Sequence, residues 1–446
     1  MKTSSFPKGI PYIIGNEAAE RYSFYGMKAI LFVFLTEFIH NARGELAVLD
    51  DTQADFWFHL FVFGAYGISV LGAFLSDIAW GKYRTIMVLS IVYCIGHFVL
   101  ALFETHTGFL VGCGLIAIGA GGIKPCVSAH VGDQFTRANA HLIERMYNYF
   151  YLAINAGAVI AYLSAEPLLR NEFLIERGLN ATVAFGLPGL LMVAATVVFW
   201  MGRDVFIAVP PAGWAVYKRE LFSDRGWILM KRLVPFYVFT IFFFACFDQT
   251  GSTWVALAQE EAMDMTVAGI TFLPTQIGFI NPVFILVFAL VFPAVLYPVL
   301  RRRFGIGAVG KVTLGFALTA FSFLIVALMQ RSLDLGIEVS VLWLIAAFIV
   351  LTAGEMLVSV TVLEFSYTQA PKVMKSFIVS FYLVSVALGN AVVMAYSAWN
   401  RTGPNTTRLD DFESFVFFTV LVSAAGVGFY LVNRGYREEM IVQDGR

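Results

Sequence analysis

The chain has 446 residues, of which 59% are hydrophobic and 14% are charged, and its formal net charge is −1. Soluble domains contain about 25% charged residues, so these values exclude a soluble fold, a disordered chain and a nucleic-acid-binding protein. The four cysteines lie in apolar stretches without metal-ligand spacing, which excludes a disulfide scaffold and predicts buried free thiols. What remains is a protein that crosses a membrane many times and has no large soluble domain.

Apolar segments follow one another along the whole chain, and each is long enough for a helix of about 20 residues to span a bilayer. They cover residues 10–39, 55–80, 84–103, 107–130, 145–167, 181–201, 233–258, 272–300, 309–330, 338–368, 374–398 and 412–433. These runs are far longer than the roughly 10-residue alternating strands of a membrane barrel. The sequence therefore predicts an all-α membrane protein with twelve transmembrane helices.

The basic residues predict the orientation of the chain. Of the 30 Lys and Arg residues, only Arg21, Lys28 and Lys124 lie well inside the spans, and most others lie at span ends or in loops on the side of the N-terminus. Cytoplasmic loops are enriched in basic residues, so we expect both termini to be cytoplasmic. The N-terminus does not resemble a signal peptide. We predict a multi-pass protein of the cell membrane, and the compact loops favour a bacterial inner membrane.

The longest polar connection contains Pro210 and Pro211 and divides the chain into two halves. We predict a six-helix bundle over residues 1–204, a cytoplasmic linker over 205–232 and a second six-helix bundle over 233–446. This layout, together with the sequence GAFLSDIAWGKYR at 72–84, resembles the major facilitator superfamily, whose substrate site lies near the midplane between the halves. Within that loop, Asp77 is expected to act in gating as part of a conformational latch.

The first span carries four ionisable residues, Glu17, Glu20, Arg21 and Lys28. Each would cost about 2.5–3.5 kcal/mol at the centre of a bilayer. At about 100° per residue, these four and Tyr25 fall within an arc of about 140° on one helix face. This polar face must look into a wet cavity or at polar partners, although a purely structural cluster of ion pairs remains the alternative.

Three further ionisable residues interrupt apolar spans. Lys124 lies between a glycine-rich turn and Pro125, where it can face a cavity or, alternatively, extend towards the cytoplasmic side. Asp248 and Glu355 are single carboxyls in apolar surroundings. A carboxyl that is alternately paired and unpaired changes its proton affinity, so both are candidate proton carriers.

Polar side chains of two other spans are candidates for the same cavity. His59 and Tyr66 share a face of span two, and His59 is either a structural group or a proton site. Tyr147, Tyr151 and Asn155 recur every four residues along span five. Such an aromatic stripe usually packs in a core, but the asparagine at its end favours a polar pocket.

The order of these motifs resembles the proton-dependent oligopeptide transporter family over nearly the whole chain. The matching stretches are NEAAERYSFYG at 16–26, GGIKPCVSAHVGDQF at 121–135, FYLAINAG at 150–157, FDQTGS at 247–252, Asn281-Pro282, Gly354-Glu355 and LEFSYTQAP at 363–371. His59 and the stretch at 364–371 look closer to the animal members of the family.

The resemblance implies proton-driven uptake of di- and tripeptides. Proton coupling would then use Glu17, Glu20, Arg21, His59, Lys124 and Asp248. The peptide carboxylate would lie near Lys124 and Lys28, and the peptide amine near Glu355. The remaining residues expected around the peptide are Tyr25, Tyr66, Tyr151, Asn155, Asn281, Phe244 and Tyr382.

Several positions depart from the family pattern. Lys28 stands where the family often has arginine, so a bidentate clamp becomes a point charge. Phe244 and Tyr382 stand where animal members have tryptophan. Arg232 matches a gating cation, but Pro293 stands where we expect its acidic partner.

The sequence therefore predicts a symporter that imports di- and tripeptides with protons by alternating access. It would need no cofactor, metal, nucleic acid or obligate protein partner, and would work in a lipid bilayer on the energy of the proton gradient. The main alternative is another small anionic substrate, such as nitrate, carried by the same fold. A drug or sugar carrier of the superfamily is disfavoured, because such carriers lack the Gly-Ile-Lys-Pro signature found at 122–125. A membrane enzyme is disfavoured, because the sequence has no catalytic triad, metal-ligand spacing or phosphate loop.

Overall fold

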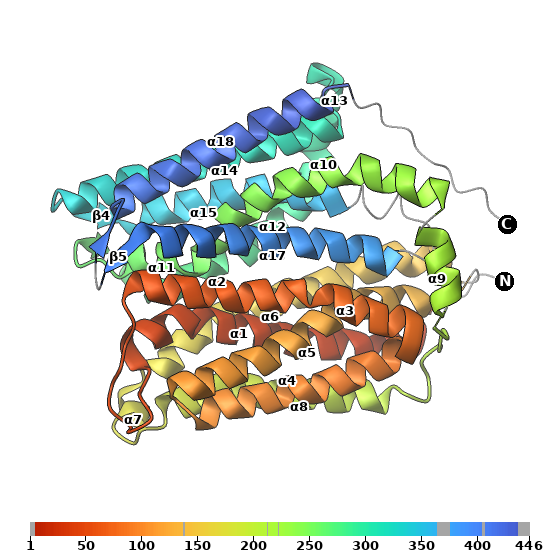
Figure 1. The fold of residues 1–446 in the computed structure, drawn as a ribbon, viewed down its shortest axis with the longest axis horizontal. Helices are drawn as coiled ribbons and strands as arrows, with labels where there is room; N and C mark the ends of the chain where they lie inside the picture. The colour runs from red at the N-terminus through yellow and green to blue at the C-terminus, as the bar shows by residue number, and fades with distance from the viewer. Residues whose placement is uncertain are drawn as a thin grey trace.

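The computed structural model describes residues 5–136, 139–211, 213–221, 223–363, 375–403 and 406–435. Within these ranges, eleven helices are long and apolar enough to cross a membrane. The first helix is of similar length, running through α1 (Ile10–Val33) and η1 (Phe34–Phe38), but it carries the four ionisable residues expected from the sequence. The twelve transmembrane helices and the all-α class are confirmed, and the helices lie roughly antiparallel along one direction (Figure 1).

The helices of the first half follow the expected spans. After the first helix come α2 (Asp51–Gly67), α3 (Ser69–Phe74) with η2 (Leu75–Trp80), α4 (Lys82–Leu102), α5 (His106–Asp133), η3 (Ala140–Leu142), α6 (Ile143–Leu169), the short α7 (Glu172–Ile175) and α8 (Asn180–Met201).

The second half begins with α9 (Trp214–Leu221) and α10 (Asp224–Phe247). It continues through η4 (Asp248–Gly251), α11 (Thr253–Ala258), η5 (Pro274–Phe279), α12 (Ile280–Val291), η6 (Phe292–Leu296), α13 (Tyr297–Phe304), α14 (Ala308–Asp334), α15 (Val341–Glu355), η7 (Met356–Val360), α17 (Lys375–Asn400) and α18 (Asp411–Asn433). The expected linker over 205–232 is thus partly helical, because α10 starts at Asp224 rather than at Leu233.

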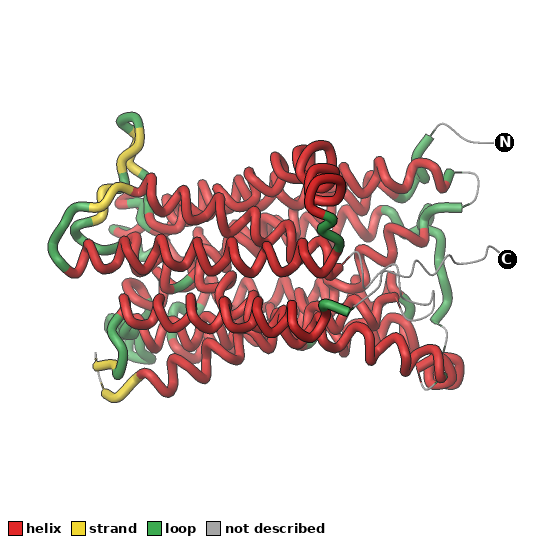
Figure 2. The backbone as a smooth tube through the Cα atoms, turned by 90° about the horizontal axis from the view of Figure 1, so that it is seen from above, coloured by secondary structure: helices red, strands yellow, loops and turns green. Residues whose placement is uncertain are grey.

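Three pairs of very short strands occur in the loops. β1 (Met263–Asp264) pairs in parallel with β4 (Val339–Ser340), with Met263 opposite Val339. β2 (Thr266–Val267) and β3 (Ile270–Thr271) form one antiparallel hairpin, and β5 (Arg401–Gly403) and β6 (Thr406–Thr407) form another. These strands lie at the end of the molecule away from both termini (Figure 2). We call that end distal and the end with the termini proximal.

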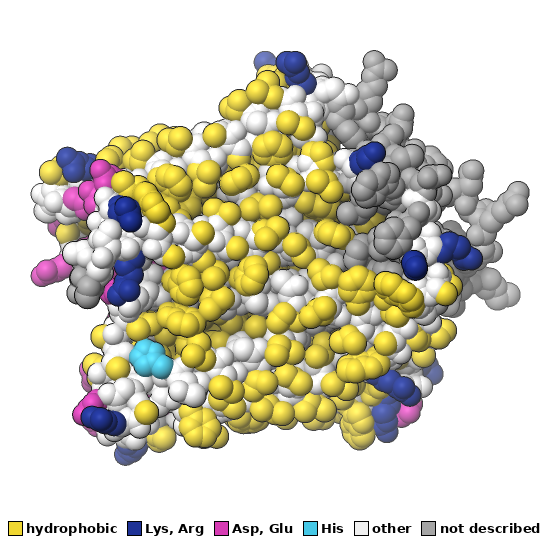
Figure 3. All heavy atoms as spheres, in the orientation of Figure 1, with side chains coloured by type: hydrophobic (Ala, Val, Ile, Leu, Met, Phe, Trp, Pro, Cys, Tyr) yellow, Lys and Arg dark blue, Asp and Glu magenta, His cyan; other side chains and the backbone are white. Residues whose placement is uncertain are grey.

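Polar residues begin several helices at the distal end. The side chains of Asp50, Thr105 and Asp410 each accept a hydrogen bond from a backbone N–H in the first turn of α2, α5 and α18, respectively. Such caps satisfy N–H groups that a helix leaves without partners. Between the ends, hydrophobic side chains cover the middle of the visible face, while charged side chains gather at its two ends (Figure 3). This band identifies a multi-pass membrane protein.

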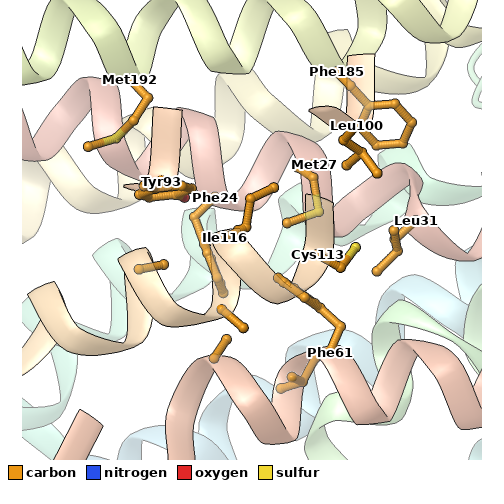
Figure 4. Close-up of a cluster of buried hydrophobic side chains, with 14 of the residues drawn as sticks. Phe24, Met27, Leu31, Phe61, Tyr93, Leu100, Cys113, Ile116, Phe185 and Met192 are labelled. Carbon is orange, nitrogen blue, oxygen red and sulfur yellow. The ribbon is translucent and has the colours of Figure 1, made fainter. Parts of the chain in front are cut away.

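The buried apolar side chains form two large clusters, one in each half of the chain. The first joins α1, α2, α4, α5 and α8, and Figure 4 shows part of it, with Phe24 and Met27 of α1 lying near Tyr93 and Ile116. The second joins α10, α14, α15, α17 and α18. Tyr66, Val70 and Phe74 of the first half also pack against this second cluster, so α2 and α3 form part of the contact between the halves.

Glycines allow helices to approach closely within the first half. A Cβ atom added to Gly72 of α3 would lie 2.2 Å from the backbone oxygen of Gly122 in α5, whereas one added to Gly114 would meet nothing within 4 Å. We therefore expect Gly72→Ala to lower the free energy of unfolding by about 1–3 kcal/mol, the usual range for an overpacked contact.

Thermal unfolding in detergent, followed by intrinsic fluorescence, measures this effect. Gly114→Ala is the matched control, and it should leave the Tm unchanged or slightly raised, because alanine favours a helix over glycine. Equal Tm values for the two variants would show that the α3–α5 contact is not as close as the structure has it.

Candidate functional site

The polar face of α1 carries a cluster of three buried charges. Arg21 Nε lies 2.7 Å from Glu17 Oε1 and 2.8 Å from Glu20 Oε2. Both carboxyls are almost fully buried. Buried charges are stable only when they are paired, and one guanidinium holding two carboxylates leaves this cluster with a net negative charge that a proton or another cation can neutralise.

The buried ammonium of Lys124 lies between two aromatic rings. Its Nζ lies 3.6 Å from the ring centroid of Phe24 and 3.7 Å from that of Tyr66. Among the described residues, this buried nitrogen has no hydrogen-bond partner. α5 continues through Pro125 as a regular helix, so the expected distortion at Lys124 does not break it. The two rings hold the ammonium, which leaves its N–H groups available to an anionic ligand.

A buried ion pair joins the two halves of the chain. Lys28 Nζ of α1 lies 2.7 Å from Asp248 Oδ1, at the point where α10 tightens into η4. The other oxygen of Asp248 accepts a hydrogen bond from Asn390 Nδ2 of α17, at 2.8 Å. The ammonium of Lys28 is therefore occupied by the carboxylate of Asp248 in this state.

His59 extends this network in the distal direction. Its Nδ1 lies 2.6 Å from Asn390 Oδ1, and its Nε2 lies 3.1 Å from Ser252 Oγ and 3.3 Å from Asp55 Oδ1. Every one of these contacts except that with Asp55 crosses between the halves. The histidine predicted as a proton site thus belongs to a hydrogen-bonded chain that reaches Asp248 and Lys28.

Glu355 faces the same central region from the second half. Its Oε2 accepts a hydrogen bond of 2.7 Å from Asn281 Nδ2, and the same amide nitrogen lies 3.1 Å from Thr352 Oγ1. The hydroxyl of Tyr25 lies close enough to Arg21, Asp248 and Glu355 to interact with their charges. The structure therefore arranges charges of both halves around one aromatic side chain.

Aromatic side chains line the region between these charges. The Phe244 and Tyr382 rings meet edge to face with centroids 5.7 Å apart, and Tyr151 Oη lies 3.9 Å from the sulfur of Met356 across the two halves. Asn155 donates its amide to the backbone oxygen of Tyr151, at 2.8 Å. Asn155 thus bonds within its own helix, and its carbonyl oxygen is the part that could meet a ligand.

A second polar network closes the distal end between the halves. Arg170 donates two bonds of 2.6 Å to the carboxylate of Glu37 and one of 2.7 Å to Glu166. From the second half, Gln259 Nε2 donates to Glu37 at 2.6 Å, and the backbone N–H of Thr275 donates to Glu166 at 2.8 Å. We call these five residues the distal latch.

The distal latch should weaken when its bidentate contact is lost. Arg170→Lys keeps the charge but cannot hold Glu37 with two parallel bonds, so we expect about a tenfold rise in the ratio of distally open to closed molecules, equivalent to about 1.4 kcal/mol.

Spin labels at Leu46→Cys and Ile270→Cys report this opening as a longer inter-label distance. Both positions are more than half exposed and lie at the distal end of opposite halves, while all four native cysteines are buried. Arg177→Lys is the matched control, because Arg177 lies over the Phe173 ring within the first half. An unchanged distance distribution in Arg170→Lys would mean that the latch does not hold the end closed.

Comparison with known proteins decides the family. Residues 83–221 and 228–407 match the model of the POT family. The chain belongs to the POT family. This confirms the resemblance inferred from the motifs.

Relatives in the POT family include Peptide transporter 3 of Caenorhabditis elegans, which is 32% identical over 384 residues, or 76% of this chain and 52% of that protein. Solute carrier family 15 member 2 of Rattus norvegicus is 33% identical over 376 residues, or 74% of this chain and 50% of that protein. The chain thus spans about half the length of the curated relatives it matches.

Solved POT family structures cover the chain almost completely. An auto-inhibited POT family peptide transporter superimposes with a TM-score of 0.87 at 31% identity, covering 99% of both chains. The POT family transporter PepTSo gives a TM-score of 0.82 at 33% identity, covering 97% of this chain and 99% of the other. The arrangement of the helices is therefore that of POT family transporters of the major facilitator superfamily.

Asp77, one of the two gating candidates, lies apart from the central charges. Asp77 lies in η2 near the proximal end, where its carboxyl accepts a hydrogen bond of 3.3 Å from Ser76. Lys82 of the same loop pairs with Asp133, at 2.6 Å. The side chain of Arg232 and residues 364–371 of the expected motif lie outside the described part of the structure.

Sequence reasoning missed several polar residues of these networks. Glu37, Asp55 and Glu166 lie inside predicted spans, and the rule that selected Asp248 and Glu355, an ionisable residue in an apolar run, would have selected them too. Asn390 and Gln259 carried no comparable signal, because an amide in a span is less costly than a charge. Their roles follow only from the side chains they meet.

Proposed function

We propose that this protein is a symporter that imports di- and tripeptides together with protons. The observation that carries the proposal is the separation of charge across the central region: an unpartnered ammonium, Lys124, lies on the first half, and a carboxyl, Glu355, lies on the second. A peptide zwitterion has the opposite charges at its two ends, so it would bridge the halves. Several relatives are named peptide transporters.

Binding would begin with a proton. Neutralising Glu20 would loosen its hold on Arg21, and neutralising Asp248 would release Lys28 from its ion pair. Two cations, Lys124 and Lys28, would then be available to the peptide carboxylate. The same protons would be needed for peptide binding and would be released when the Arg21–Glu20 and Lys28–Asp248 pairs form again. Proton and peptide would therefore cross the membrane together.

The driving force follows from the proposed orientation. We place both termini and the proximal end in the cytoplasm, with the distal latch facing outward, in the inner membrane of a bacterium. Residues 1–204 and 233–446 would then rock against each other around the central site, with 205–232 as the connection. A membrane potential of 100 mV, negative inside, supplies about 2.3 kcal/mol per proton, and no cofactor is required.

Uptake of labelled dialanine into proteoliposomes with an imposed pH gradient and membrane potential tests this proposal. We expect accumulation that depends on both gradients and that trialanine inhibits, whereas free alanine and nitrate do not. Inhibition by nitrate without inhibition by peptides would assign the site to another small anion. Absence of dialanine uptake under either gradient would reject peptide transport.

A further inference from the structure

A cavity of about 80 Å³ opens at the distal end beside the hydrogen-bonded chain of His59. Its exposed lining includes Asp51, Glu260 and Asp411, and its buried lining includes Asp55 of α2, which is only 6% exposed. No lysine, arginine or histidine is among the described residues that line it. The cavity has room for several water molecules, and its acidic walls attract cations.

The carboxyl of Asp55 is positioned between this cavity and His59. Its Oδ2 accepts a short hydrogen bond from Ser397 Oγ of α17. Its Oδ1 has no hydrogen-bond donor among the described residues, but it lies 3.3 Å from His59 Nε2. Because this oxygen faces the imidazole, it is the atom through which Asp55 can exchange a proton with His59 Nε2.

The neighbouring hydrogen bonds determine which nitrogen of His59 is free. Asn390 donates its amide nitrogen to Asp248 and to the backbone oxygen of Val386, so its carbonyl oxygen accepts from His59 Nδ1–H. In the neutral ring, Nε2 therefore carries no proton and can accept one from Ser252. An additional proton must enter at Nε2, which is the nitrogen that faces Asp55.

We propose that Asp55 is the proton relay between the distal cavity and His59. A proton from water in the cavity binds Asp55 Oδ1. The O–H bond then breaks as an N–H bond forms at His59 Nε2, which leaves an Asp55 carboxylate beside an imidazolium. The positive charge, held next to Asn390, weakens the attraction between Asp248 and Lys28. This inference rests on the proton coupling proposed above and assigns its entrance.

The other charged groups around the pair support this direction of transfer. Asp51 and Asp411 line the mouth of the cavity, Asp334 lies behind Gln330, and Lys28 and Asp248 lie beyond the imidazole. Burial, followed by the carboxylates of Asp411 and Asp334, raises the pKa of Glu260. Glu260 therefore binds and releases protons closer to neutral pH than a free glutamate. This suits a group that takes up protons from solution at the entrance of the cavity.

Asp55→Asn tests the relay with two measurements. In proteoliposomes, we expect proton-driven dialanine uptake to fall about tenfold or more, because a positioned proton donor usually contributes about 100-fold or more to the rate of a proton-transfer step. Exchange of labelled for unlabelled dialanine, which needs no net proton movement, should change by less than about twofold.

The second measurement does not depend on transport. After a rapid pH drop, infrared difference spectroscopy of the protein in detergent follows protonation of the His59 ring. The bands of this ring are identified by their absence from the spectrum of His59→Gln. We expect this signal to appear about tenfold more slowly in Asp55→Asn than in the unsubstituted protein. Failure of dialanine uptake in the unsubstituted protein would reject the proposed function. The rate of His59 protonation would still show whether Asp55 is the relay.

Two control variants separate the relay from a structural role. Ser397→Ala removes the bond across the halves but keeps the carboxylate, and Glu104→Gln alters another acid–histidine pair, with His40 at 3.8 Å, away from the cavity. In both variants, His59 should become protonated at the same rate as in the unsubstituted protein. An unchanged rate in Asp55→Asn, or an equal loss in Ser397→Ala, would overturn the proposal.

Discussion

Glu20→Gln is expected to abolish the accumulation of dialanine against its gradient. At 100 mV, one proton per peptide supplies about 2.3 kcal/mol, which corresponds to about fortyfold accumulation, and the variant should reach a ratio of about one. The glutamine has nearly the same shape but cannot ionise. Arg21 would keep only Glu17 as its ionised partner, at 2.7 Å, so the cluster would remain permanently in its neutralised form.

Two further measurements make this prediction specific. Exchange of labelled for unlabelled dialanine should survive in Glu20→Gln, since binding and reorientation remain possible without proton release. Glu45→Gln, in an exposed distal loop where Asn41 is the partner, is the matched control and should accumulate peptide normally. Undiminished, pH-dependent accumulation by Glu20→Gln would remove this residue from the coupling mechanism.

Glu355→Gln is expected to weaken dialanine binding by about 10–100-fold. The carboxylate would lose a charge-assisted hydrogen bond with the peptide amine, worth about 1.5–3 kcal/mol. Asn281 would still lie beside the side chain, because its amide can bond to the glutamine oxygen as it does to the carboxylate. Glu338→Gln, an exposed residue before α15, is the matched control and should bind dialanine normally.

Changing the ligand tests the same contact from the other side. N-acetyl-dialanine has no charged amine, so it should bind the unsubstituted protein as weakly as dialanine binds Glu355→Gln. The variant should bind the two ligands about equally, because the interaction is already absent. Calorimetric titration gives all four affinities, and simple additivity of the two losses would show that Glu355 and the amine do not interact.

The apolar pattern of the sequence was sufficient to predict the fold. Continuous runs fitted a bilayer and excluded other architectures, and the structure places helices at all twelve. The start of α10 at Asp224, rather than at 233, lies in the connection between the halves. There the sequence is mixed, so no sharp change in hydropathy marks where the helix begins.

The sequence also identified most of the central charges but not their pairing. Lys28 and Asp248 are 220 residues apart and meet at 2.7 Å, and nothing local in either segment specifies that contact. Lys28 was therefore expected beside the peptide carboxylate, whereas in this state it is held by Asp248. Lys124 Nζ, in contrast, has no hydrogen-bond partner in the part of the chain that the structure describes. Pairing depends on how the halves pack, which local patterns do not contain.

The distal latch is another feature that the sequence did not predict, for a different reason. Glu166 is fully buried and belongs to a span predicted from its apolar neighbours. Its place in an apolar run marks it as a candidate, as it does Asp248 and Glu355, but gives no reason to expect a partner in the other half. The structure pairs it instead with Arg170 and with the backbone of Thr275 from the other half.

Proton entry that depends on peptide tests the central claim most directly. Proteoliposomes containing the protein and an internal pH-sensitive dye are held at equal pH on both sides with an inward-negative potential, and dialanine is then added outside. The account predicts acidification of the lumen that requires dialanine and is lost in Glu20→Gln. Entry of labelled dialanine without acidification would contradict it.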